Sequence, residues 1–137
     1  MRYNERSMKD ITGGTVTLEP EGYVRIEFVG NPTYRTVDAM CQQTLKHVDE
    51  LKAAQKPLLG LVDLTRQTGF NTGSNKASVE ALIKIEYDRV ALVSDKALFG
   101  DLANAIIRAV GKGDRSKVFD TRKAALEWLL RPVAPMI

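Results

Sequence analysis

The chain has 137 residues, of which 44% are hydrophobic and 27% are charged, and its formal net charge is +3. These values are typical of one globular domain that buries a core without disulfides or metal, and they exclude disordered and fibrous classes. The positive charges are scattered, so we expect no nucleic-acid partner. The apolar segments are too short and too charged to cross a bilayer, so no membrane span is expected.

The features that report on compartment favour the cytoplasm. The first six residues contain no apolar run, so no signal peptide is predicted. A single cysteine, Cys41, cannot form an internal disulfide, and Asn31-Pro32-Thr33 is not a glycosylation site because proline occupies the middle position. We therefore expect a cytoplasmic protein.

The amino-terminal third predicts an arm, a hairpin and a long helix. Residues 1–14 lack periodicity and are interpreted as an N-terminal arm. Residues 15–19 and 23–29 alternate with period two around a Pro-Glu-Gly turn, which is typical of a β-hairpin. Residues 34–55 place apolar side chains on one stripe at helical spacing, which predicts an amphipathic helix.

The remainder alternates strands and helices. Pro57 to Leu64 is a continuous apolar run closed by Asp63, as in a parallel strand buried on both faces. An irregular loop is predicted over 65–73. The later elements are a helix at 74–85, a strand at 88–93, a helix ending at Val110, a strand at 115–119 and a last helix before Pro132.

This order predicts an α/β fold with the succession ββαβαβαβα. A hairpin followed by βα alternation indicates a mixed five-stranded sheet: an antiparallel edge hairpin plus parallel strands joined by right-handed crossovers, with helices covering the sheet. We expect residues 15–131 to form a single domain and residues 132–137 to form a C-terminal tail.

Three acids are candidates for chemistry at the carboxyl ends of the strands: Asp63, Asp95 and Asp120. Converging carboxylates there hold Mg²⁺ or act as acid and base. Asp95 and Asp120 also suit helix caps. The motif Asp-x-Asp-x-Thr lacks its second acid, because Thr65 occupies that position. We therefore expect Asp63 to be structural and the chain not to be an enzyme, with an acid-based site at Asp63 as the weakest option.

His47 and Cys41 are better explained by structure than by chemistry. His47 is the only histidine and cannot build a typical zinc set, so no metal is expected. Cys41 lies on the inward stripe of its helix, which predicts a buried and inert thiol. No sequence motif indicates a cofactor.

The segment 65–78 is the main candidate for a functional surface. Its hydroxyl side chains lie near the amino end of a helix, where they cap free N–H groups or where the helix dipole would favour a phosphate. Phe70 is expected to be exposed in the middle of the loop. The candidate partner or ligand residues are Asp63, Thr65, Phe70, Thr72, Ser74 and Ser78.

The pattern resembles the STAS superfamily, and more closely its SpoIIAA-like branch, often described alongside CRAL-TRIO-type lipid-binding folds. The residues that carry the resemblance are 22–30, 58–64, 89–93, 118–121 and 125–129. In the best-understood STAS relatives the loop after the central strand is a phosphorylation switch that docks on a kinase-type anti-sigma factor. The Asp-Ser-Ser-Gly-like motif of that switch is missing here, and the nearest positions are Ser74 and then Thr72.

Two classes of function remain open at this stage. The first is a non-enzymatic regulatory or interaction module that presents the loop and the following helix to an unidentified protein partner or to a second copy of the chain. The alternative is a protein that binds a small apolar or lipid-like ligand beside residues 65–85. The combination of Phe70 with the small inward residues Ala77 and Ala81 favours this alternative.

Overall fold

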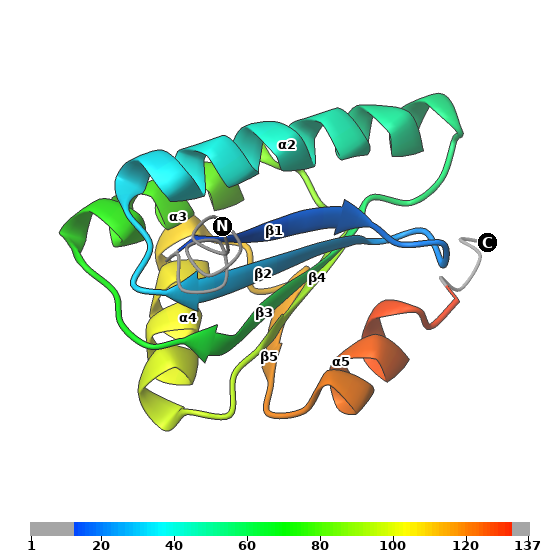
Figure 1. The fold of residues 1–137 in the computed structure, drawn as a ribbon. Coiled ribbons are helices and arrows are strands. Elements are labelled where there is room, and N and C mark those ends of the chain that lie inside the picture. The colour runs from blue at the N-terminus through cyan, green and yellow to red at the C-terminus, as the bar shows by residue number, and fades with distance from the viewer. Residues whose placement is uncertain (1–12, 133–137) are drawn as a thin grey trace, which may run out of the picture.

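The computed structural model describes residues 13–132 as a sheet with helices on both faces (Figure 1). The predicted arm and tail lie mostly outside the described residues, although the first strand begins two residues earlier than expected, at Gly13. The elements are β1 (Gly13–Leu18), β2 (Val24–Gly30), α2 (Tyr34–Ala53), β3 (Leu59–Gln67), α3 (Thr72–Lys84), β4 (Arg89–Val93), α4 (Ala97–Val110), β5 (Ser116–Phe119) and α5 (Arg122–Leu129).

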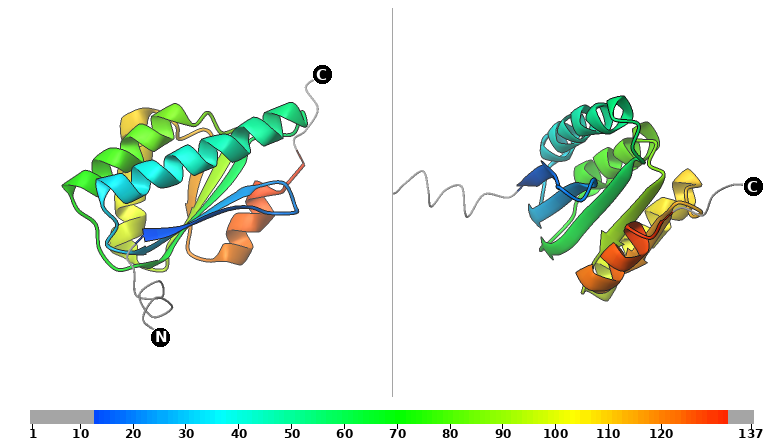
Figure 2. Two further views of the ribbon diagram at one scale, coloured as in Figure 1. Left: turned by 45° about the horizontal axis from the view of Figure 1, so that its top comes forward. Right: turned by 90° about the vertical axis from the view of Figure 1, so that its right-hand side faces the viewer.

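The predicted fold class is confirmed. The strands follow the order β1-β2-β3-β4-β5, with β1 antiparallel to β2 and every later pair parallel. Because the parallel strands advance in one direction, right-handed crossovers place α2, α3 and α4 on the same face. The last helix, α5, returns over the opposite face and packs against β3, β4 and β5 (Figure 2).

Two apolar clusters follow from this arrangement, one on each face of the sheet. Val24 and Ile26 of β2 pack with Met40 and Leu51 of α2 on one face, whereas Leu61 of β3 packs with α5 on the other. Leu61 is fully buried. The central strand β3 is therefore covered on both sides, as its continuous apolar run predicts. Within residues 13–132, none of the helices has the length and apolarity needed to cross a membrane.

The predicted loop 65–73 is mostly wrong. Strand β3 continues to Gln67, and α3 begins at Thr72 after the N-cap Asn71, so only residues 68–71 connect them. The register of β2 against β3 shifts between Glu27 and Val29, which marks a β-bulge after Asp63. The hydroxyl-rich composition of this stretch is typical of a loop, but Thr is also common in strands. The composition therefore does not reveal that β3 continues.

The last two helices begin at the predicted capping segments 94–96 and 120–121, but Asp95 and Asp120 are not themselves the N-caps. The N-cap of α4 is Lys96 rather than Asp95, and the Ser94 hydroxyl accepts the Lys96 N–H. The N-cap of α5 is Thr121 rather than Asp120, and its hydroxyl accepts the Ala124 N–H. At the other end of α4, Gly111 adopts a left-handed φ of 72° and stops the helix, as predicted.

Gly60 tests how closely β3 is packed. A Cβ added there would lie 2.5 Å from Cε1 of the buried Tyr87 ring. We expect Gly60→Ala to lower the free energy of unfolding by about 1–3 kcal/mol because the ring has to move. The matched control is Gly113→Ala, since nothing lies within 4 Å of that position. Urea unfolding of both variants measures the difference, and equal stabilities would contradict the packing.

Candidate functional site

An apolar cavity of about 120 Å³ lies between the sheet and the helical layer of α2, α3 and α4. Ile26 and Val62 line it from the sheet, and each helix contributes apolar side chains. Examples are Met40 of α2, Ala81 of α3 and Ile106 of α4. Helices α2, α3 and α4 and the sheet beneath them therefore all contribute to the wall of the cavity.

The cavity exists because α3 carries small residues where it faces the sheet. Ser74, Ala77, Ser78 and Ala81 recur at helical spacing, and all except Ala77 line the cavity directly. On α2 the equivalent stripe carries larger side chains such as Val48 and Leu51, which fill their space. Interiors normally close-pack, so a helix with short side chains over a wide sheet leaves a void.

Phe70 lies at the edge of this site. Its ring contacts the Phe99 ring edge-on, with centroids 5.6 Å apart, and the buried Phe99 lines the cavity. Phe70 is half-buried, so the expectation that it stands exposed in a loop is wrong. The pairing of aromatic rings gives Phe70 a packing role beside the cavity.

Ser74 belongs to a helix cap. Its hydroxyl accepts the Asn71 N–H at 3.0 Å, while the Asn71 side chain accepts the Ser74 N–H at 2.8 Å, which together form a capping box. Ser74 is only 3% exposed. A phosphate on Ser74 would break this cap and bury charge, whereas Thr72 at the first position of α3 is exposed.

Two polar side chains of the cavity lining, Tyr87 and Cys41, are themselves buried. The Tyr87 side chain is only 5% exposed. Burial raises the pKa of Tyr87, and the nearby Cys41 thiol raises it further. Burial likewise raises the pKa of the Cys41 thiol, so it stays protonated and unreactive, as predicted.

The Asp63 side chain lies on the face of β3 opposite the cavity, and both of its carboxylate oxygens accept hydrogen bonds. Its Oδ1 accepts the Thr65 N–H at 2.9 Å and the Thr65 hydroxyl at 2.6 Å. Its Oδ2 accepts from Arg122 of α5 at 3.0 Å. The sequence predicts donors in a loop after the strand for Asp63, but Thr65 donates from within β3. Asp63 also ties α5 to the central strand.

The pKa of Asp63 reflects two opposing effects. Burial raises it, but the hydrogen bonds from Thr65 and Arg122 and the charge of Arg122 together outweigh burial, so the pKa lies below its ordinary value. The carboxylate is therefore ionised at neutral pH and holds its partners. A depressed pKa of this kind suits a structural anchor better than a general acid.

The other candidate residues identified from the sequence do not come together in one site. Within residues 13–132, no group of three or more His, Cys, Asp or Glu side chains is placed to hold a metal ion. His47 is half-buried as predicted, and its Nδ1 lies 3.2 Å from the Glu50 carboxylate on the same helix. Ser78 lines the cavity, whereas Thr65 faces Asp63 on the far side of the sheet.

Comparison with known proteins identifies the fold. No protein-family model and no curated protein matches the chain. Among solved structures, the chain is similar to an uncharacterized protein of the DUF3478 family with a SpoIIAA-like fold, from Shewanella loihica PV-4. The TM-score is 0.66 at 20% sequence identity, over 88% of this chain and 96% of the other. The chain therefore has the SpoIIAA-like α/β fold that its sequence resembles.

Three residues of these sites were missed from the sequence: Phe99, Tyr87 and Arg122. Phe99 lies one residue from Leu98, which seemed the better core residue but is 64% exposed. Tyr87 lies in the connection between α3 and β4, where no periodicity marks burial. Arg122 reaches Asp63 across 59 residues, and a pairing at that distance leaves no local pattern.

The Asp63–Arg122 contact makes stability depend on pH in a defined direction. Because the folded-state pKa is lowered, the contribution is complete above the unfolded-state pKa of about 3.9 and is lost as pH falls through the folded-state value. We expect Asp63→Asn to lower the free energy of unfolding by about 1–3 kcal/mol at neutral pH. Urea unfolding from neutral to acidic pH measures the gap between parent and variant.

The control for this experiment is Asp101→Asn on α4. Asp101 is exposed and makes no ion pair or hydrogen bond within the described residues. Its variant should match the parent at neutral pH. A gap for Asp63→Asn that stayed constant down to strongly acidic pH would show that the charge of Asp63 contributes nothing.

Proposed function

We propose that this protein binds a small apolar molecule in the cavity between the sheet and the α2–α4 layer. One observation carries the proposal: a largely apolar pocket of about 120 Å³, partly open to solvent, lies under the small side chains of α3. A ligand that fills it removes apolar surface from water, which stabilises the complex by about 25 cal/mol per Å² buried.

The size of the cavity limits the ligand. An engineered protein cavity of about 150 Å³ stays dry and binds benzene or xenon. The cavity here, at about 120 Å³, suits a molecule no larger than a single ring or a short branched chain.

Binding rather than catalysis is the role that this chemistry supports. The cavity lining offers a neutral thiol, a neutral phenol and a few uncharged polar side chains near α3. Asp63, which the sequence singled out for acid chemistry, lies on the other face of β3 and holds Thr65 and Arg122. The proposed module therefore recognises its ligand by shape and apolar contact.

Filling the cavity tests the proposal. Ala81→Leu adds carbon atoms where Ala81 lines the void, so the variant should be as stable as the parent or more stable, and it should lose ligand binding. Benzene is a suitable probe, and the measured quantity is the rise of melting temperature at saturating benzene. The parent should show a clear rise and the Ala81→Leu variant should show none.

The control is Ala109→Leu, which adds the same atoms at an exposed position of α4. This variant should respond to benzene like the parent. If Ala81→Leu is instead destabilised by more than about 1–3 kcal/mol, the space is already filled by close packing and the proposal fails. An unchanged benzene response in Ala81→Leu would also contradict it.

A second candidate, a regulated docking surface on the outer side of α3, is favoured by one observation. Ile83 is 53% exposed there, and the exposed Thr72 lies at the amino end of the same helix, where a phosphate would be stabilised. If the partner is a second copy of the chain, sedimentation velocity should show a dimer that Ile83→Ser weakens. A monomer at every concentration would exclude self-association through this face.

A further inference from the structure

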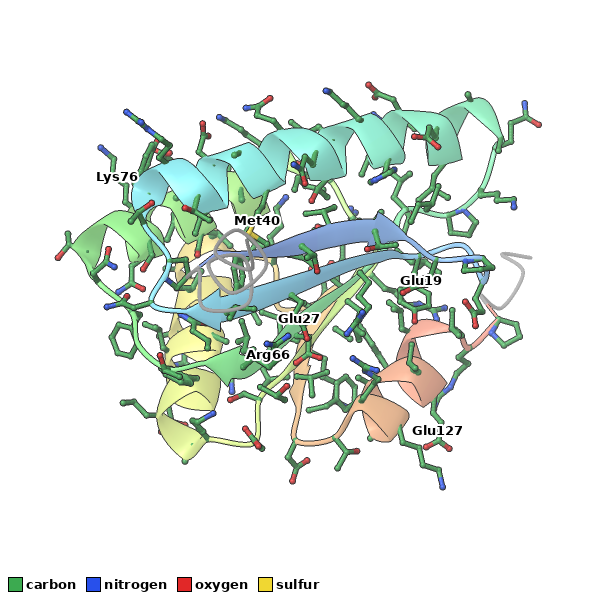
Figure 3. The ribbon with its side chains drawn as sticks, viewed as in Figure 1. Glu19, Glu27, Met40, Arg66, Lys76 and Glu127 are labelled. Atoms are coloured by element: carbon green, nitrogen blue, oxygen red, sulfur yellow. The ribbon has the colours of Figure 1, made fainter. Side chains whose placement is uncertain are left out.

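A second polar site lies on the face of the sheet opposite the cavity, around Glu27 of β2. Arg25 Nη2 lies 3.4 Å from Glu27 Oε2, and Arg66 Nη1 lies 3.5 Å from Glu27 Oε1. Figure 3 shows Glu27 and Arg66 side by side on neighbouring strands, beside α5. Both distances exceed the usual 2.7–3.2 Å of an N–H···O bond, so the two guanidinium groups retain donors without close acceptors.

The β-bulge in β3 creates this arrangement. Alternation along a regular strand would turn Arg66 toward the cavity face, together with Val62 and Leu64. The shift of register after Asp63 instead brings Arg66 beside Glu27. Bulges are common where a strand must redirect a side chain at a functional site.

Asp63 and Arg122 extend the same polar site. Glu27 and Asp63 are register partners on adjacent strands, so their carboxylates lie on one face as neighbours. Both are largely buried, with 12% and 5% of their side chains exposed, whereas Arg66 and Arg122 are exposed by 59% and 49%. The site thus presents Arg66 and Arg122 toward solvent, beside the half-buried Arg25 and over two buried carboxylates.

Donors in this site outnumber acceptors. Arg25 Nε is buried and has no hydrogen-bond partner. Tyr23, which lies just before β2, is buried. Burial raises the pKa of this tyrosine and so do Glu19 and Glu21, while Arg122 and Arg25 act against them, which places the phenol in the field of both arginines.

We propose that the cluster of Arg25, Arg66 and Arg122 binds a small phosphate-type oxyanion, either free or as a phosphate ester. Guanidinium groups match the paired oxygens of a phosphate in planar, bidentate geometry. A bound anion would accept hydrogen bonds from the arginine N–H groups that lie far from the Glu27 oxygens. Its negative charge would also balance the one arginine charge that Glu27 and Asp63 leave unbalanced. Arg66 lies at the carboxyl end of β3 and Arg122 follows the carboxyl end of β5, the edge at which open α/β sheets bind ligands.

This site is independent of the cavity. The strand β3 separates them, since Val62 and Leu64 line the cavity while Asp63 and Thr65 face the arginines. A nucleic acid would need a longer track of cations, and the scattered net charge of +3 does not provide one. The observations therefore favour a single anionic group.

Nuclear magnetic resonance of the arginine Nε–H groups tests the proposal. We expect inorganic phosphate, added at constant ionic strength against sodium chloride, to shift the Arg25 and Arg66 signals along a saturating curve. Phenyl phosphate in a parallel titration distinguishes a site for the free anion from a site for an ester, according to which binds more tightly. Saturation by neither compound beyond the effect of chloride would overturn the proposal.

Two variants and one control locate the binding. Arg66→Gln and Arg25→Gln should each weaken phosphate binding by about tenfold or more, because each removes a charged hydrogen-bond donor. Arg66 is exposed, so its variant should fold normally even if Arg25→Gln does not. Arg108→Gln removes an exposed charge on α4 and should bind like the parent. Equal affinities for Arg66→Gln and Arg108→Gln would show only a general charge effect and would overturn the assignment.

Discussion

The structure depends on one constraint, which is that β3 is buried on both faces although it carries an acid in its middle. The apolar residues of the strand pack into the two apolar clusters. Val62 faces the helical layer, and Leu61 faces α5. Asp63 satisfies its charge through Thr65 and Arg122 rather than through solvent. A buried carboxylate without such partners would be strongly destabilising. The position of α5 is thereby coupled to the central strand by a charge pair as well as by apolar packing.

The bulge after Asp63 explains why one strand serves two chemically different surfaces. Up to Asp63 the strand alternates normally, and each face receives every second side chain. Beyond it, the extra residue lets Thr65 turn back to Asp63 and lets Arg66 reach Glu27. The apolar cavity and the arginine cluster therefore lie on opposite faces of the sheet. Neither surface needs a long loop, since only residues 68–71 separate β3 from α3.

Most of the fold could be predicted from the sequence because the patterns that specify its helices and strands are local. The period-two hairpin, the helical stripe of α2 and the apolar run around Leu61 each predict their element, and the chain order then predicts the sheet. The sites were less accessible. Thr65 was predicted in a loop because threonine suits both loops and strands, and the packing of the loop residue Phe70 against Phe99 left no local pattern. Arg122 and Phe99 act through contacts with residues far away in the chain, and such contacts leave no periodicity.

The small residues of α3 show how stability and binding are connected in this fold. A helix that carries Ser74, Ala77, Ser78 and Ala81 toward the sheet gains little apolar burial, so α3 depends on its ends and on its neighbours. The Asn71–Ser74 capping box holds its amino end, and Tyr34 of α2 donates a hydrogen bond to Glu80 at its side. Helix α3 can therefore remain in place over a void that apolar packing alone would tend to close. A ligand in that pocket would contact α3 directly, and its binding would stabilise this helix.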